Sequence, residues 1–259
     1  MTAVFEIFFA RYQTHKNCDV NLGINKEPSK MPTTKLLEVT FSLPLKPYEV
    51  PAFRGAIIEL VGRENVAFHN HIGEDKFVYK YPLIQYKANR GKAHIVCLNE
   101  GVEELYALFS KKNHIIRIGE NSSRLNIDNI NVSSPFIQAW DKNFLYSVSN
   151  WLPLSGENFK KYINTESLSE KIRMLEKIFI GHVLSFAKGI DWNIDKEIKV
   201  SIHEIKREKI ITYKKVKLKA FDVIISSNIY FPNLIGLGKG TSTGFGVVKH
   251  TRKPGNFNE

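Results

Sequence analysis

The order of strand and helix signals in residues 36–118 most constrains what this chain can fold into. Residues 36–45, LLEVTFSLPL, run apolar or alternate with β-branched and aromatic side chains and stop before Pro47, which predicts a strand. Residues 51–61, PAFRGAIIELV, place their large apolar side chains on one helical face and end before Gly62. A strand followed at once by an amphipathic helix is therefore the first unit of the fold.

Further signals complete that unit. They predict strands at residues 66–71, 80–87 and 93–98, a helix at 101–110, and a closing strand at 114–118. This order of strand, helix, strands, helix and strand is typical of a ferredoxin-like α+β sandwich of about 80 residues.

The second half of the chain begins another such cycle. Strands are predicted at 124–132 and 144–152, a helical region at 156–188, two long strands at 198–207 and 210–228, and a short helix-like FPNLIG segment. We place a domain boundary near residue 120, in the polar segment GENSS, so that the two domains cover residues 35–120 and 121–259.

Residues 1–34 are predicted to form an amino-terminal extension that is poorly ordered. Residues 14–35 are polar, and Met31 stands directly before the first strand signal. The short apolar stretch near the start lacks a preceding basic region and a small-residue cleavage site, so a secretory signal is not expected.

Charge points to a polyanionic partner. The chain carries 37 Lys and Arg against 26 Asp and Glu, a formal net charge of +11.

Its two cysteines, Cys18 and Cys97, show no CxxC spacing and no disulfide framework. No apolar run reaches the roughly 20 residues of a membrane span. We therefore expect a soluble, cytoplasmic protein with no membrane partner.

A glycine-rich segment closes the chain. Residues 236–248, GLGKGTSTGFGVV, combine five glycines with a lysine and three hydroxyl residues, and such a loop lets the backbone approach a phosphate. It is not a Walker loop, because no Lys-Ser or Lys-Thr pair opens a helix, and its spacing fits a dinucleotide fingerprint poorly. A flexible hairpin at the end of a sheet is the alternative interpretation.

The segment NLIGLGKGTSTGFGVVKH resembles the terminal signature of the CRISPR-associated repeat endoribonucleases. PAFRGAIIELVG, FHNHIGEDKFVYKYPLIQYK and KAHIVCLNEG resemble the amino-terminal half of the b-type branch of that family. The resemblance spans most of residues 35–250. It implies two tandem ferredoxin-like (RRM-like) domains and a CRISPR repeat RNA, precursor and processed, as partner. A homodimer and a larger CRISPR effector complex are further possible partners.

The segment AFHNHIGEDKFVY supplies His69, His71, Lys76 and Tyr79. Metal-free RNA cleavage needs a base for the 2′-hydroxyl proton, an acid for the leaving 5′-oxygen and a donor for the phosphorane charge, and histidine suits the first two roles. If residues 68–71 are extended, both histidines point to one face. The resemblance implies a His-x-His pair and a nearby tyrosine at this position. His71 is then our first candidate and His69 the second, Tyr79 is a hydroxyl donor, and Lys76 stabilises the anion.

Two other interpretations of the histidine pair stay open. Together with Glu74 and Asp75 it could ligate a metal, and both histidines could be exposed turn residues with a structural role only. The HNH tripeptide lacks the metal finger of the HNH nucleases. His94 and His182 lie in apolar elements, where satisfied core or boundary histidines are expected, and no GxSxG nucleophile elbow occurs.

Basic residues cluster along the two long strands, with only Glu208 opposing them, and together with the glycine-rich loop they are the predicted RNA contacts. A solvated strand face is the alternative. The predicted contacts are Lys206, Arg207, Lys209, Lys214, Lys215, Lys217, Gly236, Gly238, Lys239, Gly240, Gly244 and Gly246.

The sequence thus predicts a metal-independent endoribonuclease that cuts CRISPR precursor RNA within each repeat by 2′-hydroxyl attack and leaves a 2′,3′-cyclic phosphate. No cofactor and no bound metal are implied. A catalytically inactive repeat-RNA-binding protein of the same fold is the main alternative, and a metal-dependent nuclease is a third.

Overall fold

The structure is a computed structural model that describes residues 34–69, 71–72, 76–77, 80–213 and 216–251. At residues 71, 72, 76 and 77 the description covers the backbone. The expected extension at residues 1–34 lies almost wholly outside the described residues.

The first half is a four-stranded antiparallel sheet with helices on one face. The strands are β1 (Leu36–Pro44), β4 (Ile84–Asn89), β5 (Lys92–Leu98) and β8 (Ile127–Ser133), in the order β4-β5-β1-β8. The helices are α2 (Val50–Val61), α3 (Glu100–Glu104) and α4 (Tyr106–Phe109). This is the ferredoxin-like arrangement of strand, helix, two strands, helix and strand. The α+β prediction is confirmed.

Alternation along the strands builds the core of this half. Leu37, Val39 and Phe41 point to one face of β1 and pack with Phe53 and Ile57 of α2. All five side chains are at most 1% exposed, so they anchor α2 to the sheet.

Two element predictions in this half are wrong. Residues 114–118 do not close the sheet, because β6 (Ile115–Ile118) pairs with β7 (Asn121–Arg124) in a separate two-stranded ribbon. The closing strand is β8, which we had assigned to the second half and which pairs with β1 from Phe41 to Leu36. β6 has four residues, whereas β8 has seven and pairs with β1 at six positions, so β8 supplies the longer hydrogen-bonded ladder at the closing edge. We propose that the two halves divide after Ser133.

Residues 66–71 are not one strand either. Val66–Phe68 form a 3₁₀ turn (η2), and only His71–Ile72 (β2) are extended, paired with Lys76–Phe77 (β3). The predicted extended run from 68 to 71 that would have aligned two histidines is therefore interrupted.

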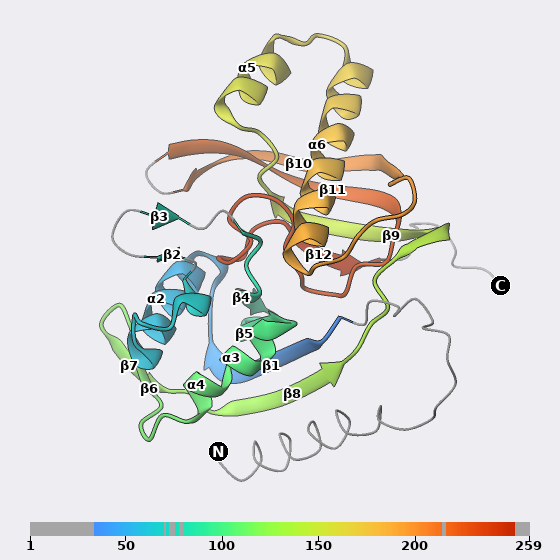
Figure 1. Cartoon of the computed structure of the whole chain (residues 1–259). Coiled ribbons are helices and arrows are strands. Elements are labelled where there is room, and N and C mark those ends of the chain that lie inside the picture. The colour runs from blue at the N-terminus through green and yellow to red at the C-terminus, as the bar shows by residue number, and fades with distance from the viewer. Residues whose placement is uncertain (1–33, 70, 73–75, 78–79, 214–215, 252–259) are drawn as a thin grey trace, which may run out of the picture.

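The second half repeats the same sheet order. Its strands are β9 (Ala139–Trp151), β10 (Val200–Tyr213), β11 (Val216–Ile229) and β12 (Val247–His250), in the order β10-β11-β9-β12. One face is covered by α6 (Leu168–Gly189), whose Leu175, Phe179, Val183 and Phe186 are fully buried. The chain is thus a tandem ferredoxin-like α+β fold (Figure 1).

Three details of the second half differ from the predictions. The helical region splits into α5 (Gly156–Asn164) and α6, because Ser155 and Ser167 each accept a hydrogen bond from a first-turn amide and start a separate helix. The turn of the long hairpin lies between Tyr213 and Val216 rather than near residue 208. Residues 230–246, all described, form no helix, so FPNLIG is a turn and the glycine-rich loop occupies the place of the second helix.

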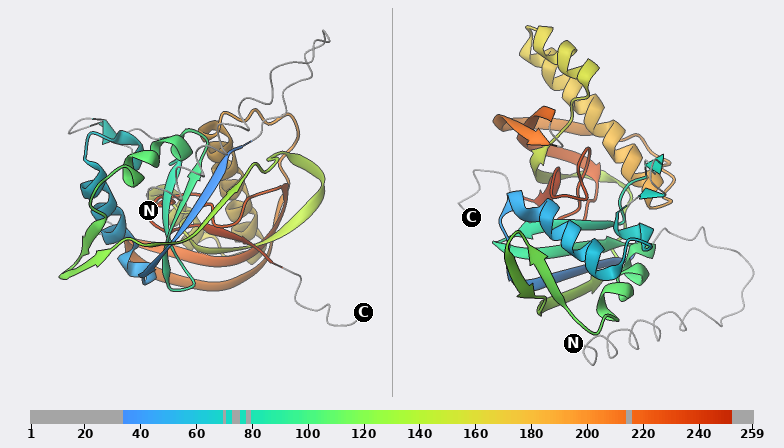
Figure 2. Two further views of the ribbon diagram at one scale, coloured as in Figure 1. Left: turned by 90° about the horizontal axis from the view of Figure 1, so that it is seen from below. Right: turned by 90° about the vertical axis from the view of Figure 1, so that its left-hand side faces the viewer.

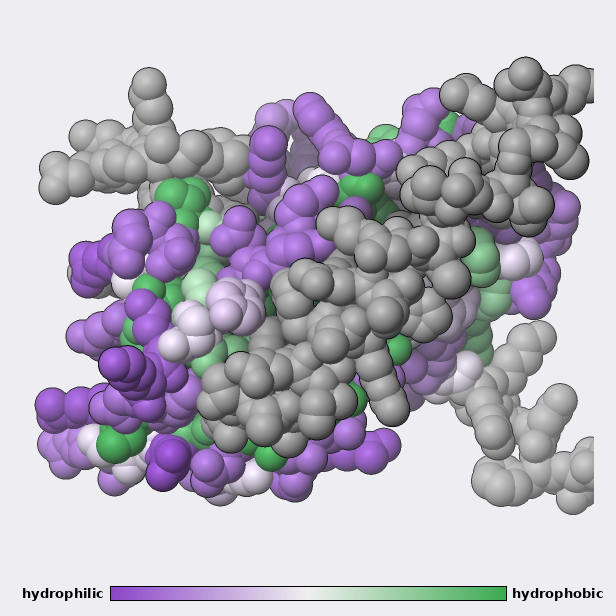
Figure 3. Space-filling view, turned by 60° about the horizontal axis from the view of Figure 1, so that its bottom comes forward, coloured by the Kyte–Doolittle hydropathy of each residue, from purple (hydrophilic) through white to green (hydrophobic). Residues whose placement is uncertain are grey.

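The two halves share buried surface. Leu36, Val96 and Leu98 of the first sheet belong to the same apolar cluster as Phe186 and Trp192 of the second half. The right-hand view of Figure 2 shows the second half stacked on the first, with α5 and the start of α6 extending away from the first sheet. The face that Figure 3 brings forward is mostly hydrophilic where it is described, with scattered hydrophobic residues. Among the described residues no helix is long and apolar enough to cross a membrane.

Candidate nucleic-acid interface and catalytic segment

The glycine-rich loop between β11 and β12 lies between the two sheets, where Figure 1 shows it in red. Gly238, Gly240, Gly244 and Gly246 all have positive φ, between 61° and 93°. The chain therefore uses glycine where an L side chain would be strained, and the loop folds back on itself with the Leu237 amide donating to the Gly246 carbonyl at 2.9 Å.

Strand β4 of the first half and the residues before it hold this loop in place. The Tyr81 hydroxyl donates to the Gly236 carbonyl, and the Gly236 amide donates to Gln85 Oε1, each at 2.8 Å. Gln85 in turn donates to the Tyr81 hydroxyl at 2.8 Å. Lys87 Nζ donates to the Thr241 carbonyl at 2.8 Å. The loop of one half is therefore positioned by a buried polar network from the other.

Lys87 is the unusual member of this network. It is 1% exposed, and no described acidic residue forms an ion pair with it. Burial lowers the pKa of Lys87 to about 7. The charged lysine is thus costly at this position, and its hydrogen bond to the loop offsets part of that cost.

We predict that Lys87→Met changes stability in a pH-dependent way. Between pH 7 and about 10.4 the unfolded chain holds a proton on Lys87 that the folded chain lacks, so wild-type stability rises with pH there and is flat below the folded pKa. The stability of the variant relative to wild type should therefore fall by up to about 1.4 kcal/mol per pH unit across this window.

Urea unfolding of both proteins from pH 6 to 10 measures this difference. Lys112→Met, at an exposed lysine in the loop after α4, is the control and should follow the wild-type profile. A Lys87→Met difference that does not change with pH would show that the lysine is not buried in solution.

A pocket of about 350 Å³ opens beside the loop. Four segments line it: residues 80–82, α6 through His182 and Ser185, Tyr213 at the end of β10, and loop residues 238 and 240–242. Trp151 Nε1 donates to His182 Nδ1 at 3.1 Å, and burial lowers the pKa of His182 to about 4. Its Nδ1 therefore has a partner, as expected for a boundary histidine, and the ring also lines the pocket.

His69 of the predicted catalytic segment is held by Arg54 of α2 and by Arg63 in the turn after it. Arg54 Nη2 donates to the His69 carbonyl at 2.8 Å, and the His69 ring donates from Nε2 to the Arg63 carbonyl at 2.7 Å. That bond places a proton on Nε2, so the neutral ring has its acceptor at Nδ1. Burial lowers the pKa of Arg54, whose guanidinium lies near Tyr86 and Tyr213.

The remaining predicted catalytic residues are placed less fully. The backbone of β2 and β3 pairs His71 with Phe77 and Ile72 with Lys76, so residues 71 and 76 belong to one small hairpin. Tyr79 lies outside the described residues, as do Glu74 and Asp75 of the alternative metal interpretation. Within the part of the chain that is described, no three His, Cys, Asp or Glu side chains form a group that could hold a metal.

The basic strands are more neutralised than the sequence suggested. Arg207 and Lys209 lie 3.8 Å and 3.5 Å from Asp222, and Lys219 lies 2.6 Å from Glu208. We had counted only Glu208 as an opposing charge, because Asp222 reaches these residues only through the pairing of β10 with β11. Lys206 and Lys217 are exposed, with no ion pair to a described residue, and Lys214 and Lys215 lie outside the description.

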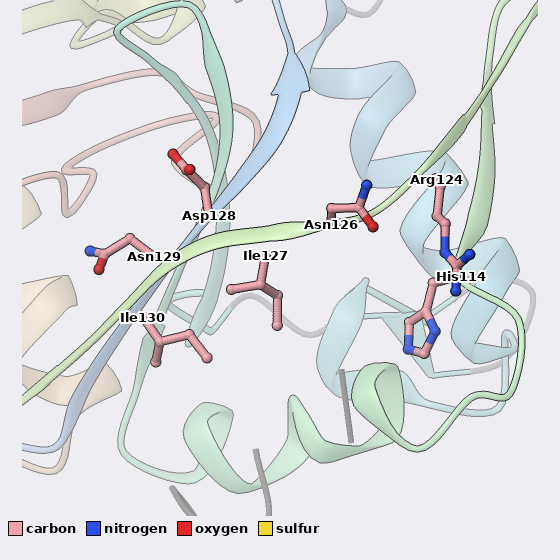
Figure 4. A pocket seen from close by; sticks show the side chains of 7 residues that line it. All are labelled: His114, Arg124, Asn126, Ile127, Asp128, Asn129 and Ile130. Atoms are coloured by element: carbon pink, nitrogen blue, oxygen red, sulfur yellow. The ribbon is translucent and has the colours of Figure 1, made fainter. Parts of the chain in front are cut away.

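Another cavity, of about 480 Å³, lies along β8. Figure 4 shows His114 and Arg124 at one end and Asp128 and Asn129 at the other. It shares no lining residue with the pocket beside the glycine-rich loop.

Sequence analysis missed Arg54, Lys87 and the pocket role of His182. Each owes its environment to a residue far away in the chain. One signal was available for Lys87: the alternation of β4 puts Gln85 and Lys87 on the face opposite the α2 core, where a polar pair requires either water or a polar partner.

Comparisons with known proteins agree with this architecture. A "Crystal structure of Cas6b" superposes with a TM-score of 0.78 at 22% identity and covers 84% of this chain and 99% of that one. A second solved structure, the CRISPR RNA processing endoribonuclease Cas6b, gives a TM-score of 0.65 at 20% identity, with 84% and 99% covered. These likenesses show the fold.

Sequence relationships identify the family. An uncharacterized protein of Methanocaldococcus jannaschii, MJ0978, is 31% identical over 101 residues, which cover 39% of this chain and 67% of that protein. The family model of the Cas6b N-terminal domain matches residues 32–135, and the model of the Cas6b C-terminal domain matches residues 138–251. Together the two models account for nearly all described residues, and the chain belongs to the Cas6b family.

Proposed function

We propose that this protein is an endoribonuclease that cuts CRISPR precursor RNA within each repeat. Its membership of the Cas6b family, with both domains matched, is the observation that carries the proposal. A related solved structure is named a CRISPR RNA processing endoribonuclease. The net charge of +11 suits an RNA substrate.

The reaction we propose is attack of the 2′-hydroxyl on the adjacent phosphate, without a metal. It leaves a 2′,3′-cyclic phosphate on one product and a 5′-hydroxyl on the other. His71 and His69 would exchange the protons, Tyr79 would donate its hydroxyl, and Lys76 would stabilise the phosphorane. The pairing of β2 with β3 supports the grouping of residues 71 and 76.

The geometry around His69 supports a positioned rather than a freely moving ring. Its main chain is tied to α2 by Arg54 and its imidazole to the Arg63 carbonyl. If His69 is the base, Nδ1 is the nitrogen that takes the proton, because the neutral ring already carries a proton on Nε2.

Incubation of the purified protein with labelled repeat RNA in EDTA tests the proposal. We expect cleavage at one position in each repeat and a product end from which phosphatase releases no phosphate until acid opens the cyclic phosphate. Cleavage that EDTA stops and Mg²⁺ restores would establish the metal-dependent alternative. Tight binding without cleavage would instead leave a repeat-RNA-binding protein.

The salt dependence of binding tests the role of the basic strands. Replacing both Lys206 and Lys217 with glutamine should weaken RNA binding and lower the slope of log affinity against log salt by about 0.7–0.9 per phosphate contact. We choose these two because no described acidic residue neutralises them.

Lys112→Gln is the matched control, since it removes an exposed charge from the first half of the chain. An equal change of slope per lysine removed in Lys112→Gln and in the Lys206 and Lys217 double variant would mean that the strands provide only general charge and no defined phosphate contact.

A further inference from the structure

The pocket beside the glycine-rich loop has a lining suited to an anion. Among its described lining residues there is no carboxylate, and Lys80 stands exposed at its edge. Lys239, also exposed, follows Gly238 in the loop. Positive charge therefore lies near the opening, with uncharged donors on the walls.

The loop offers a run of free backbone donors. No described group accepts a hydrogen bond from the amides of residues 238–242, although the carbonyls of Gly240, Thr241 and Ser242 all accept one. Successive amides in a segment with positive φ form concave sites that bind anions. The carbonyls of Thr241 and Ser242 tie the loop to β4, that of Gly240 accepts from within the loop, and the amides of residues 238–242 have no described acceptor.

His182 presents a defined donor beside the loop. Its Nδ1 accepts from Trp151, and a Cβ added at Gly238 would lie 2.9 Å from both Nδ1 and Cε1, so that edge of the ring is covered by indole and loop. With a pKa lowered to about 4 by burial, the ring is neutral near pH 7. Its single proton is then on Nε2, which forms no hydrogen bond to a described residue.

We propose that this pocket binds one phosphate of the RNA, with His182 Nε2–H as a neutral hydrogen-bond donor beside the amides of the loop. The inference rests on the proposed RNA substrate. It assigns His182 to binding and not to proton transfer, because Trp151 keeps the other ring nitrogen as an acceptor. Lys80 supplies the charge that draws the phosphate in.

Two substitutions at His182 separate the donor from its structural role. In His182→Asn the amide oxygen can replace Nδ1 as the acceptor for Trp151, while the donor at the Nε2 position is lost. In His182→Gln the longer amide can reach toward the Nε2 position and restore a donor. Thermal unfolding of both variants shows whether the Trp151 contact survives.

The probe is repeat RNA with a 2′-deoxy nucleotide at the cleavage position, which prevents cutting. We expect His182→Asn to bind it about tenfold more weakly, as for one hydrogen bond to a charged group, and His182→Gln to recover most of this loss. The salt slope should be unchanged for His182→Asn, since the donor is neutral, and lower by about one contact for Lys80→Gln.

Single methylphosphonate substitutions along the RNA then locate the phosphate. One position should weaken wild-type binding by about tenfold and should not weaken His182→Asn any further. Wild-type affinity in His182→Asn, or losses that add at every methylphosphonate position, would overturn the inference.

These outcomes are independent of catalysis. If the methylphosphonate loss is coupled to His182 but the wild type leaves unmodified repeat RNA uncut, the phosphate pocket stands and the nuclease proposal fails. If the wild type cuts repeat RNA and His182→Asn binds it with wild-type affinity, the nuclease proposal stands and the phosphate pocket is refuted.

Discussion

His71→Ala is expected to slow cleavage of repeat RNA by about 10²- to 10⁴-fold, the usual contribution of one general acid or base. The affinity for uncleavable repeat RNA should stay within about twofold, because a proton-transfer group adds little to ground-state binding. The measurement is single-turnover cleavage in EDTA beside equilibrium binding of the 2′-deoxy substrate.

His203→Ala is the matched control. His203 is an exposed histidine on β10 of the second half, whose Nε2 pairs with the Ser226 hydroxyl at 2.8 Å. It should cut at the wild-type rate. If His71→Ala also cuts at that rate while His69→Ala does not, the order of our two candidates is reversed. If neither substitution slows cleavage, this segment does not hold the acid and base.

Local patterns predicted most elements of this fold but not all of their pairings. The strand at 36–44, the helix at 50–61 and the long β10–β11 hairpin follow from apolar alternation and helical spacing alone. The roles of β6 and β8 do not, because β6, IIRI, is the more apolar of the two, whereas the closing strand β8 reads IDNINVS. The choice of β8 as the partner of β1 depends on which of them extends the backbone ladder of the sheet, and that is set by the rest of the fold.

The candidate site was predictable only where it is local in sequence. The glycine-rich loop and the His69 to Lys76 segment are each one continuous stretch of sequence. Their residue types therefore point directly to phosphate approach and proton transfer. Lys87 acts across 154 residues on Thr241, and Trp151 fixes the tautomer of His182 from a neighbouring strand. Burial lowers the pKa values of Lys87 and His182, and this burial exists only once the two halves are assembled.

Gly246→Ala is expected to destabilise the protein by about 3 kcal/mol, through the combined cost of overpacking and of an unfavourable left-handed backbone. Gly246 has a φ of 61°, and a Cβ there would collide with the Leu237 carbonyl oxygen. That neighbour is backbone, held by its own bond to Gly246, so it cannot rotate away as a side chain would. Urea unfolding measures the loss.

Gly181→Ala is the control, and this substitution should stabilise the protein. Gly181 lies within α6, has no atom within 4 Å of an added Cβ, and should gain roughly 0.5–1 kcal/mol from the higher helix propensity of alanine. Wild-type stability in Gly246→Ala would mean that the loop does not cross itself at Leu237 in solution.

The same substitution also tests whether the loop binds RNA as a preformed structure. Gly246 sits at the base of the loop, where its amide donates to the Asn150 carbonyl at 3.2 Å and its carbonyl accepts from Leu237. A displaced base would move the amides of residues 238–242 away from His182, so RNA affinity should fall even under conditions where the variant is fully folded. Binding measured at low temperature, with folding verified by circular dichroism, separates this effect from unfolding. Full affinity in a folded but destabilised Gly246→Ala would show that the loop reaches its RNA-bound form only on the RNA, and that its fixed position between the two sheets contributes to stability alone.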